Sequence, residues 1–265
     1  MYTPSKPFSF VSRLVRRVGA CASLLLVVMS GTCCVNATDE TPKSAPSEDP
    51  YKARRENMVR DDITSSRGSR TPVRDKTVLE AMLMVPRHKF VPEDLLKQAY
   101  DDNPVPIGYG QTISQPYIVA YMTEMLKPEK PFVALEIGAG SGYQAAILAQ
   151  IVKQVYTIEI VPELGESARQ RLEQLGYKNV EVRVGDGYYG WPEHGPYDAI
   201  IVTAAASHIP PPLIEQLKPG GRMAIPVGPP LHVQELMLVE KRPDGAIIKR
   251  SVMPVRFVPL TGKGG

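Results

Sequence analysis

One short stretch of this sequence constrains the fold more than any other. Residues 134–143 read Ala-Leu-Glu-Ile-Gly-Ala-Gly-Ser-Gly-Tyr, an apolar run with one acid that passes directly into a glycine-rich turn. Only glycine lets a backbone make such a turn and approach a ligand closely, because a Cβ would block both. The pattern predicts a buried strand whose following loop lies against a nucleoside-containing ligand.

The glycine spacing distinguishes between classes of cofactor. Gly138, Gly140 and Gly142 form G-x-G-x-G, and Tyr143 stands where a dinucleotide fingerprint has its third glycine. The sequence also has no G-x-x-x-x-G-K-[ST] phosphate loop. This spacing favours S-adenosylmethionine, and Tyr143 argues against the rival interpretation of an NAD-dependent oxidoreductase.

Three acids follow strands or lie within them at positions typical of a nucleoside site. Glu159 closes the next apolar run about 20 residues after the glycines, where a carboxylate binds both ribose hydroxyls. Asp186, with Gly187, follows a third apolar run and is expected at the adenine edge, unless it forms a plain Asp-Gly turn. Glu136 is expected near the methionine end of the cofactor, or as an acceptor for amides of the glycine loop.

Composition excludes other classes of site. The 4 histidines share no short spacing with cysteine, so we expect no metal site. The net charge of +3 is too small to indicate a nucleic-acid partner. All 3 cysteines lie within the first 34 residues, so the rest of the chain has no nucleophilic thiol.

The N-terminal residues resemble a targeting segment. Basic residues up to Arg17 precede an apolar stretch over 18–29, and small residues follow at 35–37. We expect a signal-like leader or anchor over 1–37, a disordered linker over 38–51, and a single catalytic domain over 52–265. A start at Met58 would remove the leader.

Apolar runs and helical patterns alternate through the expected domain. Strands are predicted at 132–137, 154–158, 180–184, 199–203 and 222–226, with helices between them, such as 162–175. Helices are also predicted over 74–85 and 117–126. Two further strands, 235–240 and 246–252, flank a Pro-Asp-Gly hairpin turn. The fold class is therefore α/β: a doubly wound, mostly parallel, Rossmann-like sheet that ends in antiparallel strands and is preceded by helices.

Several segments resemble one family closely. Residues 85–92 read Val-Pro-Arg-His-Lys-Phe-Val-Pro, residues 108–116 read Gly-Tyr-Gly-Gln-Thr-Ile-Ser-Gln-Pro, and residues 255–260 read Val-Arg-Phe-Val-Pro-Leu. With residues 135–146, 197–205 and 217–222 they resemble, in order, the motifs of the protein-L-isoaspartate O-methyltransferases. The resemblance runs from about residue 54 to 261, and residues 1–50 have no counterpart.

The resemblance implies a reaction and its site. A methyl group passes from S-adenosylmethionine to the α-carboxylate of an L-isoaspartyl residue, and the ester then closes to a succinimide that hydrolyses partly to aspartate. Ser114 matches the active-site serine, although a loop serine also often bonds only to its own backbone. Substrate contacts are expected from Thr112, Ile113, Gln115, Val258 and Thr261; for the C-terminal segment an ordinary edge strand is the alternative.

The alternatives concern substrate and compartment. Another methyltransferase, acting on a small-molecule oxygen or carboxylate, is the first rival. Amine methylation is disfavoured, because residues 203–206 read Thr-Ala-Ala-Ala where those enzymes resemble one another in an Asn/Asp-Pro-Pro-aromatic motif. A non-enzymatic exported binding protein would be expected to lack some of the glycines and acids. We expect a cytoplasmic monomer acting on isoaspartyl proteins and peptides, with export, or membrane attachment by an uncleaved leader, as the alternative.

Overall fold

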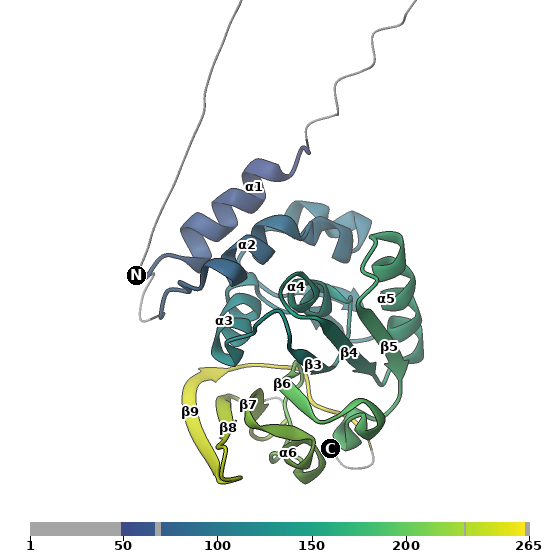
Figure 1. Ribbon diagram of the computed structural model, residues 1–265. Helices are drawn as coiled ribbons and strands as arrows, with labels where there is room; N and C mark the ends of the chain where they lie inside the picture. The colour runs from purple at the N-terminus through teal and green to yellow at the C-terminus, as the bar shows by residue number, and fades with distance from the viewer. Residues whose placement is uncertain (1–48, 67–69, 231, 263–265) are drawn as a thin grey trace, which may run out of the picture. The chain divides into compact units, whose positions relative to one another are not determined.

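The computed structural model describes residues 49–66, 70–230 and 232–262. Strands and helices alternate as the sequence predicts (Figure 1). The helices are α1 (Lys52–Asn57), α2 (Lys76–Met84), α3 (Pro116–Leu126), α4 (Tyr143–Ile151), α5 (Pro162–Gln174) and α6 (Pro211–Glu215). The strands are β1 (Val105–Gly108), β2 (Gln111–Ile113), β3 (Val133–Ile137), β4 (Gln154–Glu159), β5 (Val180–Val184), β6 (Tyr197–Val202), β7 (Leu217–Val227), β8 (Gln234–Lys241) and β9 (Ile247–Val255).

Seven of these strands form one sheet in the order β5-β4-β3-β6-β7-β8-β9. The pairs from β5 to β7 are parallel, and β7, β8 and β9 pair antiparallel. The predicted mostly parallel sheet with antiparallel last strands is therefore confirmed. The chain runs outward from β3 to β5 and returns to the other side of β3 at β6, so strand order reverses there, where ligands bind in such sheets.

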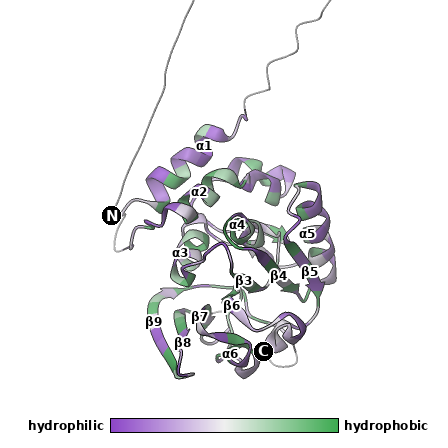
Figure 2. Cartoon of the chain, viewed as in Figure 1, coloured by the Kyte–Doolittle hydropathy of each residue, from purple (hydrophilic) through white to green (hydrophobic). Residues whose placement is uncertain are grey.

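The two faces of the sheet have separate apolar cores because successive strand residues point in opposite directions. On β3, Ala134 packs with the N-terminal helices, α3 and α4, whereas Leu135 packs with the β6–β7 side and α6. Helix α4 is buried almost all round, and in Figure 2 it is mainly hydrophobic where the outer helix α5 is mainly polar. Burial on both faces holds the carboxyl ends of β3, β4 and β6 in fixed positions.

Local sequence sets the ends of the helices that flank the site. The Asp75 carboxylate caps α2 by accepting from the amides of Thr77 at 2.9 Å and Val78 at 3.1 Å. Helices α3 and α5 begin at Pro116 and Pro162, where a missing N–H does no harm. Strand β7 begins five residues before the predicted 222–226, because a Pro219-Gly220 turn with Gly220 at φ +86° is accommodated within its ladder.

Four 3-10 segments and a π-helical turn complete the described N-terminal part and the loops. The π turn spans Met58–Ile63, and 3-10 turns span Arg87–Phe90, Glu93–Gln98, Gly187–Tyr189 and Pro192–His194. The predicted leader, and the predicted linker up to residue 48, lie outside the described residues; the last linker residue, Tyr51, stacks on His88 with ring centroids 4.2 Å apart. No helix in the described ranges is long and apolar enough to cross a membrane.

Candidate active site

A cleft opens at the carboxyl ends of β3, β4 and β6. It holds about 750 Å³ of empty space, counting the part open to solvent. Of the residues predicted for the site, the cleft is lined by Thr112, Ile113, Ser114, Glu136, Gly138, Gly140, Glu159, Gly187, Val258 and Thr261. Segments far apart in the sequence thus meet at one place in the fold.

Glycine is required where the loop after β3 lies against its neighbours. Gly138 has φ +96°, and a Cβ there would stand 2.4 Å from Thr203 Oγ1. A Cβ on Gly187 would stand 2.3 Å from Ile137 Cγ2. The Thr203 hydroxyl donates to the Gly138 carbonyl at 2.6 Å, so the end of β6 fixes the turn at the end of β3. The loop is held open to a ligand by backbone geometry.

Glu159 lies at the end of β4 and joins two loops. One carboxylate oxygen accepts from the Gly140 amide at 2.7 Å, and the other accepts from the Val161 amide at 3.0 Å. The residue is 5% exposed and lines the cleft. Because each carboxylate oxygen has two lone pairs, the carboxylate has further acceptor positions for the hydroxyls of a ribose.

Glu136 differs from Glu159 in having no partner. It is fully buried, and neither carboxylate oxygen forms a hydrogen bond. The Thr157 hydroxyl and the Ala145 amide lie near the carboxylate but outside hydrogen-bonding geometry, so they offset the effect of burial only in part. Burial raises the pKa of Glu136 to about 8, with a smaller contribution to this rise from the negative charge of Glu159. Gly140 is bonded to Glu159 instead, so the structure does not have Glu136 holding the glycine loop through backbone amides.

Ser114 follows β2 and faces both the cleft and a second cavity. Its hydroxyl makes no hydrogen bond to any residue in the described part of the chain, and its carbonyl accepts from Arg87 at 2.8 Å. The neighbouring cavity holds about 1070 Å³ of empty space on the same measure, and it has polar lining from Thr112, Ser114 and Gln115 and apolar walls from segments near Tyr117 and Phe257. A chain segment wider than the cofactor cleft has room to approach Ser114 from this side.

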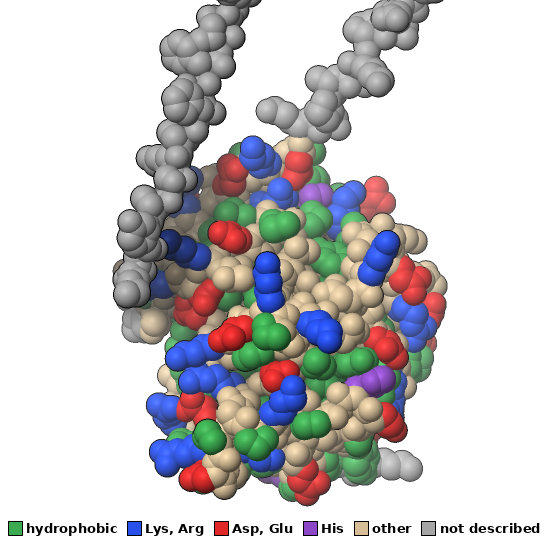
Figure 3. Space-filling view, viewed as in Figure 1, with side chains coloured by type: hydrophobic (Ala, Val, Ile, Leu, Met, Phe, Trp, Pro, Cys, Tyr) green, Lys and Arg blue, Asp and Glu red, His purple; other side chains and the backbone are tan. Residues whose placement is uncertain are grey.

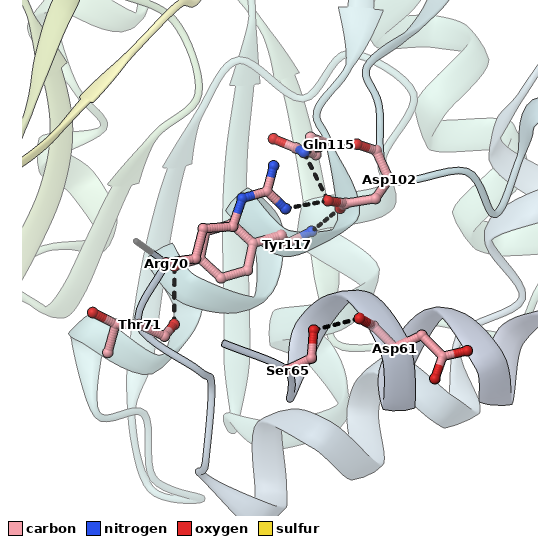
Figure 4. A network of polar contacts seen from close by, with 7 residues as sticks. All are labelled: Asp61, Ser65, Arg70, Thr71, Asp102, Gln115 and Tyr117. Atoms are coloured by element: carbon pink, nitrogen blue, oxygen red, sulfur yellow. Dashed lines mark hydrogen bonds and ion pairs between the residues drawn. The ribbon is translucent and has the colours of Figure 1, made fainter. Parts of the chain in front are cut away.

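A polar network holds the residues that follow Ser114 (Figure 4). Several of its members line the second cavity, which is called the groove below. The Asp102 carboxylate accepts from Arg70 at 2.5 Å, from the Gln115 side chain at 2.8 Å and from the Tyr117 amide at 3.1 Å. The Tyr117 hydroxyl donates to the Thr71 carbonyl at 2.9 Å. Gln115 is thereby bonded to Asp102; its side chain lines the groove and does not reach the cofactor cleft.

The segment after β9 forms the opposite wall. The Phe257 amide donates to the buried Gln234 side chain at 2.9 Å. The Ala205 amide donates to the Val258 carbonyl at 2.8 Å, and the Ala205 carbonyl accepts from the Leu260 amide at 2.7 Å. This segment is therefore paired with the loop after β6 by an isolated parallel bridge at Pro259, rather than forming an ordinary continuation of β9.

Two predicted cofactor residues do not line the cleft. Gly142, at φ +88°, begins α4, and a Cβ there would stand 3.1 Å from Leu172. Asp186 caps the 3-10 turn over 187–189 by accepting from the Tyr188 amide at 3.0 Å. The aromatic residues that follow lie outside the cleft too: Tyr189 is 50% exposed, and Trp191 packs edge-on against Tyr156.

Four side chains that hold the site were not predicted from the sequence. They are Arg87, Asp102, Thr203 and Gln234. Thr203 had a signal, because it is a polar residue at the end of the apolar run 199–202, where a parallel sheet has its site. The other three lie far from their partners in sequence. No group of three or more His, Cys, Asp or Glu in the described ranges is placed to hold a metal ion.

The charge on the molecular surface is mixed. On the face in Figure 3, lysine and arginine side chains are interspersed with aspartate and glutamate over the whole domain. Exposed ion pairs contribute to this mixing, for example Arg54 with Asp101 and Arg60 with Asp61. The face therefore presents no continuous basic area.

Comparison with known proteins gives one consistent result. The family model "Protein-L-isoaspartate(D-aspartate) O-methyltransferase" matches residues 59–265. Protein-L-isoaspartate O-methyltransferase 2 of Syntrophobacter fumaroxidans is 54% identical over 252 residues, covering 93% of this chain and 98% of that protein. Protein-L-isoaspartate O-methyltransferase 1 of Nitrosospira multiformis is 60% identical over 212 residues, covering 80% and 89%.

Solved structures agree with the sequence matches. A protein-L-isoaspartate O-methyltransferase superposes with a TM-score of 0.71 at 33% identity, covering 80% of this chain and 67% of that one. A putative enzyme of the same kind from Plasmodium falciparum, in complex with S-adenosyl-L-homocysteine, has a TM-score of 0.66 at 28% identity and covers 81% and 99%.

Proposed function

Because this chain belongs to the protein-L-isoaspartate(D-aspartate) O-methyltransferase family, we propose how its residues divide the work of that reaction. The enzyme transfers a methyl group from S-adenosylmethionine to the α-carboxylate of L-isoaspartyl residues in damaged proteins and peptides. The methyl ester then closes to a succinimide, which starts the repair. What remains to assign is which side chains hold each reactant.

Glu136, Glu159 and the glycine loop are assigned to the cofactor. The carboxylate of Glu159 accepts from the ribose hydroxyls, while the positive φ of Gly138 and Gly140 brings the backbone close to the ligand. Asp186 and Gly187 belong to the adenine end, with Asp186 holding the turn and Gly187 lining the cleft. Gly142 supports this site indirectly, by starting α4.

The observation that carries the assignment is the state of Glu136. A buried carboxylate with both oxygens unpartnered is costly unless a ligand completes it, and a cation is the ligand that does so best. S-adenosylmethionine, when bound, supplies a methyl group on a sulfonium leaving group and also carries an ammonium. Glu136 is therefore proposed to face the positively charged methionine end.

Ser114 is assigned to the acceptor. A carboxylate has a pKa of roughly 4 and is already ionised at neutral pH, so the nucleophile needs no general base. The unbonded Ser114 hydroxyl donates to one acceptor oxygen and orients the other toward the methyl group. Such orientation alone corresponds to effective molarities on the order of 10⁵ M or more. Thr112, Ile113, Gln115, Val258 and Thr261 hold the peptide around it.

The test uses two peptides that differ only in isoaspartate versus aspartate, with methyl-labelled S-adenosylmethionine. We expect base-labile label on the isoaspartyl peptide alone, and a fall in kcat of about 100-fold in Ser114→Ala. Ser251→Ala, on exposed β9, is the matched control and should keep its activity. Label on neither peptide with the unaltered chain would refute the substrate, and full activity in Ser114→Ala would refute the role of Ser114.

We propose that the working enzyme acts in the cytoplasm, because that compartment supplies S-adenosylmethionine. We also propose that it acts as a monomer. The leader-like residues 1–37 provide the reason to measure this. Fractionation of cells that carry a C-terminally tagged chain should give the tag in the cytoplasmic fraction with enzyme activity. Recovery in the membrane or exported fraction would replace this proposal with the alternative of export.

A further inference from the structure

Arg87 is a buried cation beside the acceptor loop that the assigned roles leave unused. It begins the 3-10 turn after α2 and is 0% exposed. No carboxylate of the described residues forms an ion pair with it. Taking a guanidinium out of water without an ion partner is costly, so its burial requires a reason other than filling space.

Its planar guanidinium joins three parts of the site. Nε donates to the Ala99 carbonyl and Nη2 donates to the Ser114 carbonyl, both at 2.8 Å. Its Cζ atom lies 4.8 Å from the ring centroid of Tyr143, the first residue of α4 and a residue that lines the cofactor cleft. One rigid side chain therefore contacts both the acceptor loop and the start of the helix after the glycine loop.

This position is unfavourable for the arginine itself. Nη1 has no hydrogen-bond partner, and burial lowers the pKa of the guanidinium. A methionine or leucine would fill the same space with no polar atom to satisfy. What an apolar side chain cannot do is bond two carbonyls with a fixed angle between them.

We propose that Arg87 is a positioning residue that sets Ser114 at its working distance from the cofactor loop. This rests on the role proposed above for Ser114. A charge-assisted hydrogen bond to the Ser114 carbonyl fixes the backbone from which the hydroxyl projects. The contact between Arg87 and Tyr143 fixes the position of that backbone relative to α4. A displacement of about 1 Å between reacting groups costs on the order of 100-fold in rate. A small shift of Ser114 should therefore lower kcat strongly.

The test separates the positioning of reactants from their binding. We expect Arg87→Met to lower kcat by about 30-fold, with the KM of the isoaspartyl peptide and the dissociation constant of S-adenosyl-L-homocysteine each within about threefold. Arg87→Lys keeps the charge but reaches only one carbonyl, so its kcat should lie between those of Arg87→Met and the unaltered chain. Rates are expressed per molecule able to bind S-adenosyl-L-homocysteine, so loss of folded protein does not count.

Two comparisons exclude a merely structural role. Val78→Ala, in the core of α2 and away from the cleft, should lower Tm while keeping kcat per binding-competent molecule. The double variant Arg87→Met/Ser114→Ala should be no slower than Ser114→Ala alone, because Ser114→Ala has already removed the hydroxyl that Arg87 positions. If Arg87→Met does not fold, Tyr143→Leu removes the ring contact with Arg87, together with the edge-on contact between Tyr143 and Phe90. Its kcat per binding-competent molecule should fall by about fivefold.

Other results would overturn the proposal. Additive losses in the double variant would show that Arg87 does not act through Ser114. A kcat within threefold of the unaltered chain for Arg87→Met, or a loss matched by Val78→Ala, would reduce Arg87 to a core residue. Failure of the proposed function has a different signature, since the unaltered chain would then not label the isoaspartyl peptide at all.

Discussion

The two sides of the cleft are built in different ways. On the cofactor side, the glycine loop, Glu136 and Glu159 come from one βαβ unit, and Glu159 bonds to the Gly140 amide within it. On the acceptor side, Ser114 and Val258 come from segments more than a hundred residues apart. Side chains from further segments hold that side, among them Arg87 and Gln234.

This difference separates the residues that bind the cofactor from those that bind and orient the peptide. The cofactor side is fixed by backbone conformation, so changes there should weaken cofactor binding and leave the peptide KM little affected. The acceptor side is fixed by long-range hydrogen bonds, so changes there should alter the peptide KM or kcat and leave the cofactor bound. Four substitutions or conditions test this division, in order of expected effect.

Gly138→Ala should have the largest effect. The added Cβ would stand 2.4 Å from Thr203 Oγ1 at a φ of +96°, so the loop must move. We expect the dissociation constant of S-adenosyl-L-homocysteine, measured by calorimetry, to rise about 100-fold, equivalent to roughly 2.7 kcal/mol. Gly245→Ala is the control, because it has a similar φ of +85° with nothing within 4 Å. Equal binding by both variants would show that the Thr203 contact is unimportant.

Glu159→Gln comes next. The amide replaces one acceptor oxygen with a donor, so either the Gly140 or the Val161 amide loses its partner and the ribose loses a carboxylate. Hydrogen bonds to charged groups contribute about 1.5–3 kcal/mol, so we expect binding to weaken about 30-fold. At saturating S-adenosylmethionine, kcat should change by less than about threefold. A large loss of kcat with normal binding would contradict the division.

The third prediction concerns pH and Glu136. Since burial raises its pKa to about 8, the carboxyl is mostly protonated at pH 6.5, and a cationic ligand must release that proton. Affinity for S-adenosylmethionine should therefore rise about tenfold between pH 6.5 and pH 8.5. Glu136→Gln has no proton to release and should give a flat profile over this range. A pH slope that survives in Glu136→Gln would belong to another group.

The same carboxyl affects the ligand-free chain. Its pKa is raised in the folded state, so above the ordinary value of 4.5 the unfolded chain releases a proton that the folded chain keeps. This group therefore lowers the free energy of unfolding progressively as pH rises from about 4.5 to about 8. Chemical denaturation should show that loss, with the slope removed in Glu136→Gln.

Gln234→Met should have the smallest effect, and that effect should fall on the peptide KM instead of on cofactor binding. It keeps the volume of a buried side chain but removes the acceptor for the Phe257 amide, so the wall at 255–258 loosens. A lost buried hydrogen bond costs about 1 kcal/mol, so the peptide KM should rise about fivefold. S-adenosyl-L-homocysteine should bind as before. A weakened cofactor together with a normal peptide KM would reverse the comparison.

The same contrast explains what could be predicted from the sequence. The glycine loop, Glu136 and Glu159 are encoded within 24 residues by patterns whose physical causes are local, and all of these residues except Gly142 line the cleft. The parallel pairing of the strands from β3 to β7 also follows from local alternation of strands and helices. Ser114 and Val258 needed a family resemblance, because nothing near either residue indicates that they meet.

Other residues needed the structure itself. Arg87 is 27 positions from the Ser114 carbonyl that it bonds, and its sequence neighbours indicate only the end of a helix. Asp102 follows Asp101 in the same loop, and the sequence does not show which of the two accepts from Gln115. Gln115 itself was predicted at the peptide, and in the structure it lines the groove while bonded to Asp102.

The bridge between Ala205 and Pro259 sets an order of events during synthesis. A ribosome completes β3 and β4 about a hundred codons before it reaches the segment that forms the opposite wall. The nascent chain therefore contains the glycine loop, Glu159 and the loop of Ser114 well before it contains the C-terminal wall. Until that segment docks on the loop after β6, the emerging enzyme has the loop of Ser114 but lacks the opposite wall of its acceptor site.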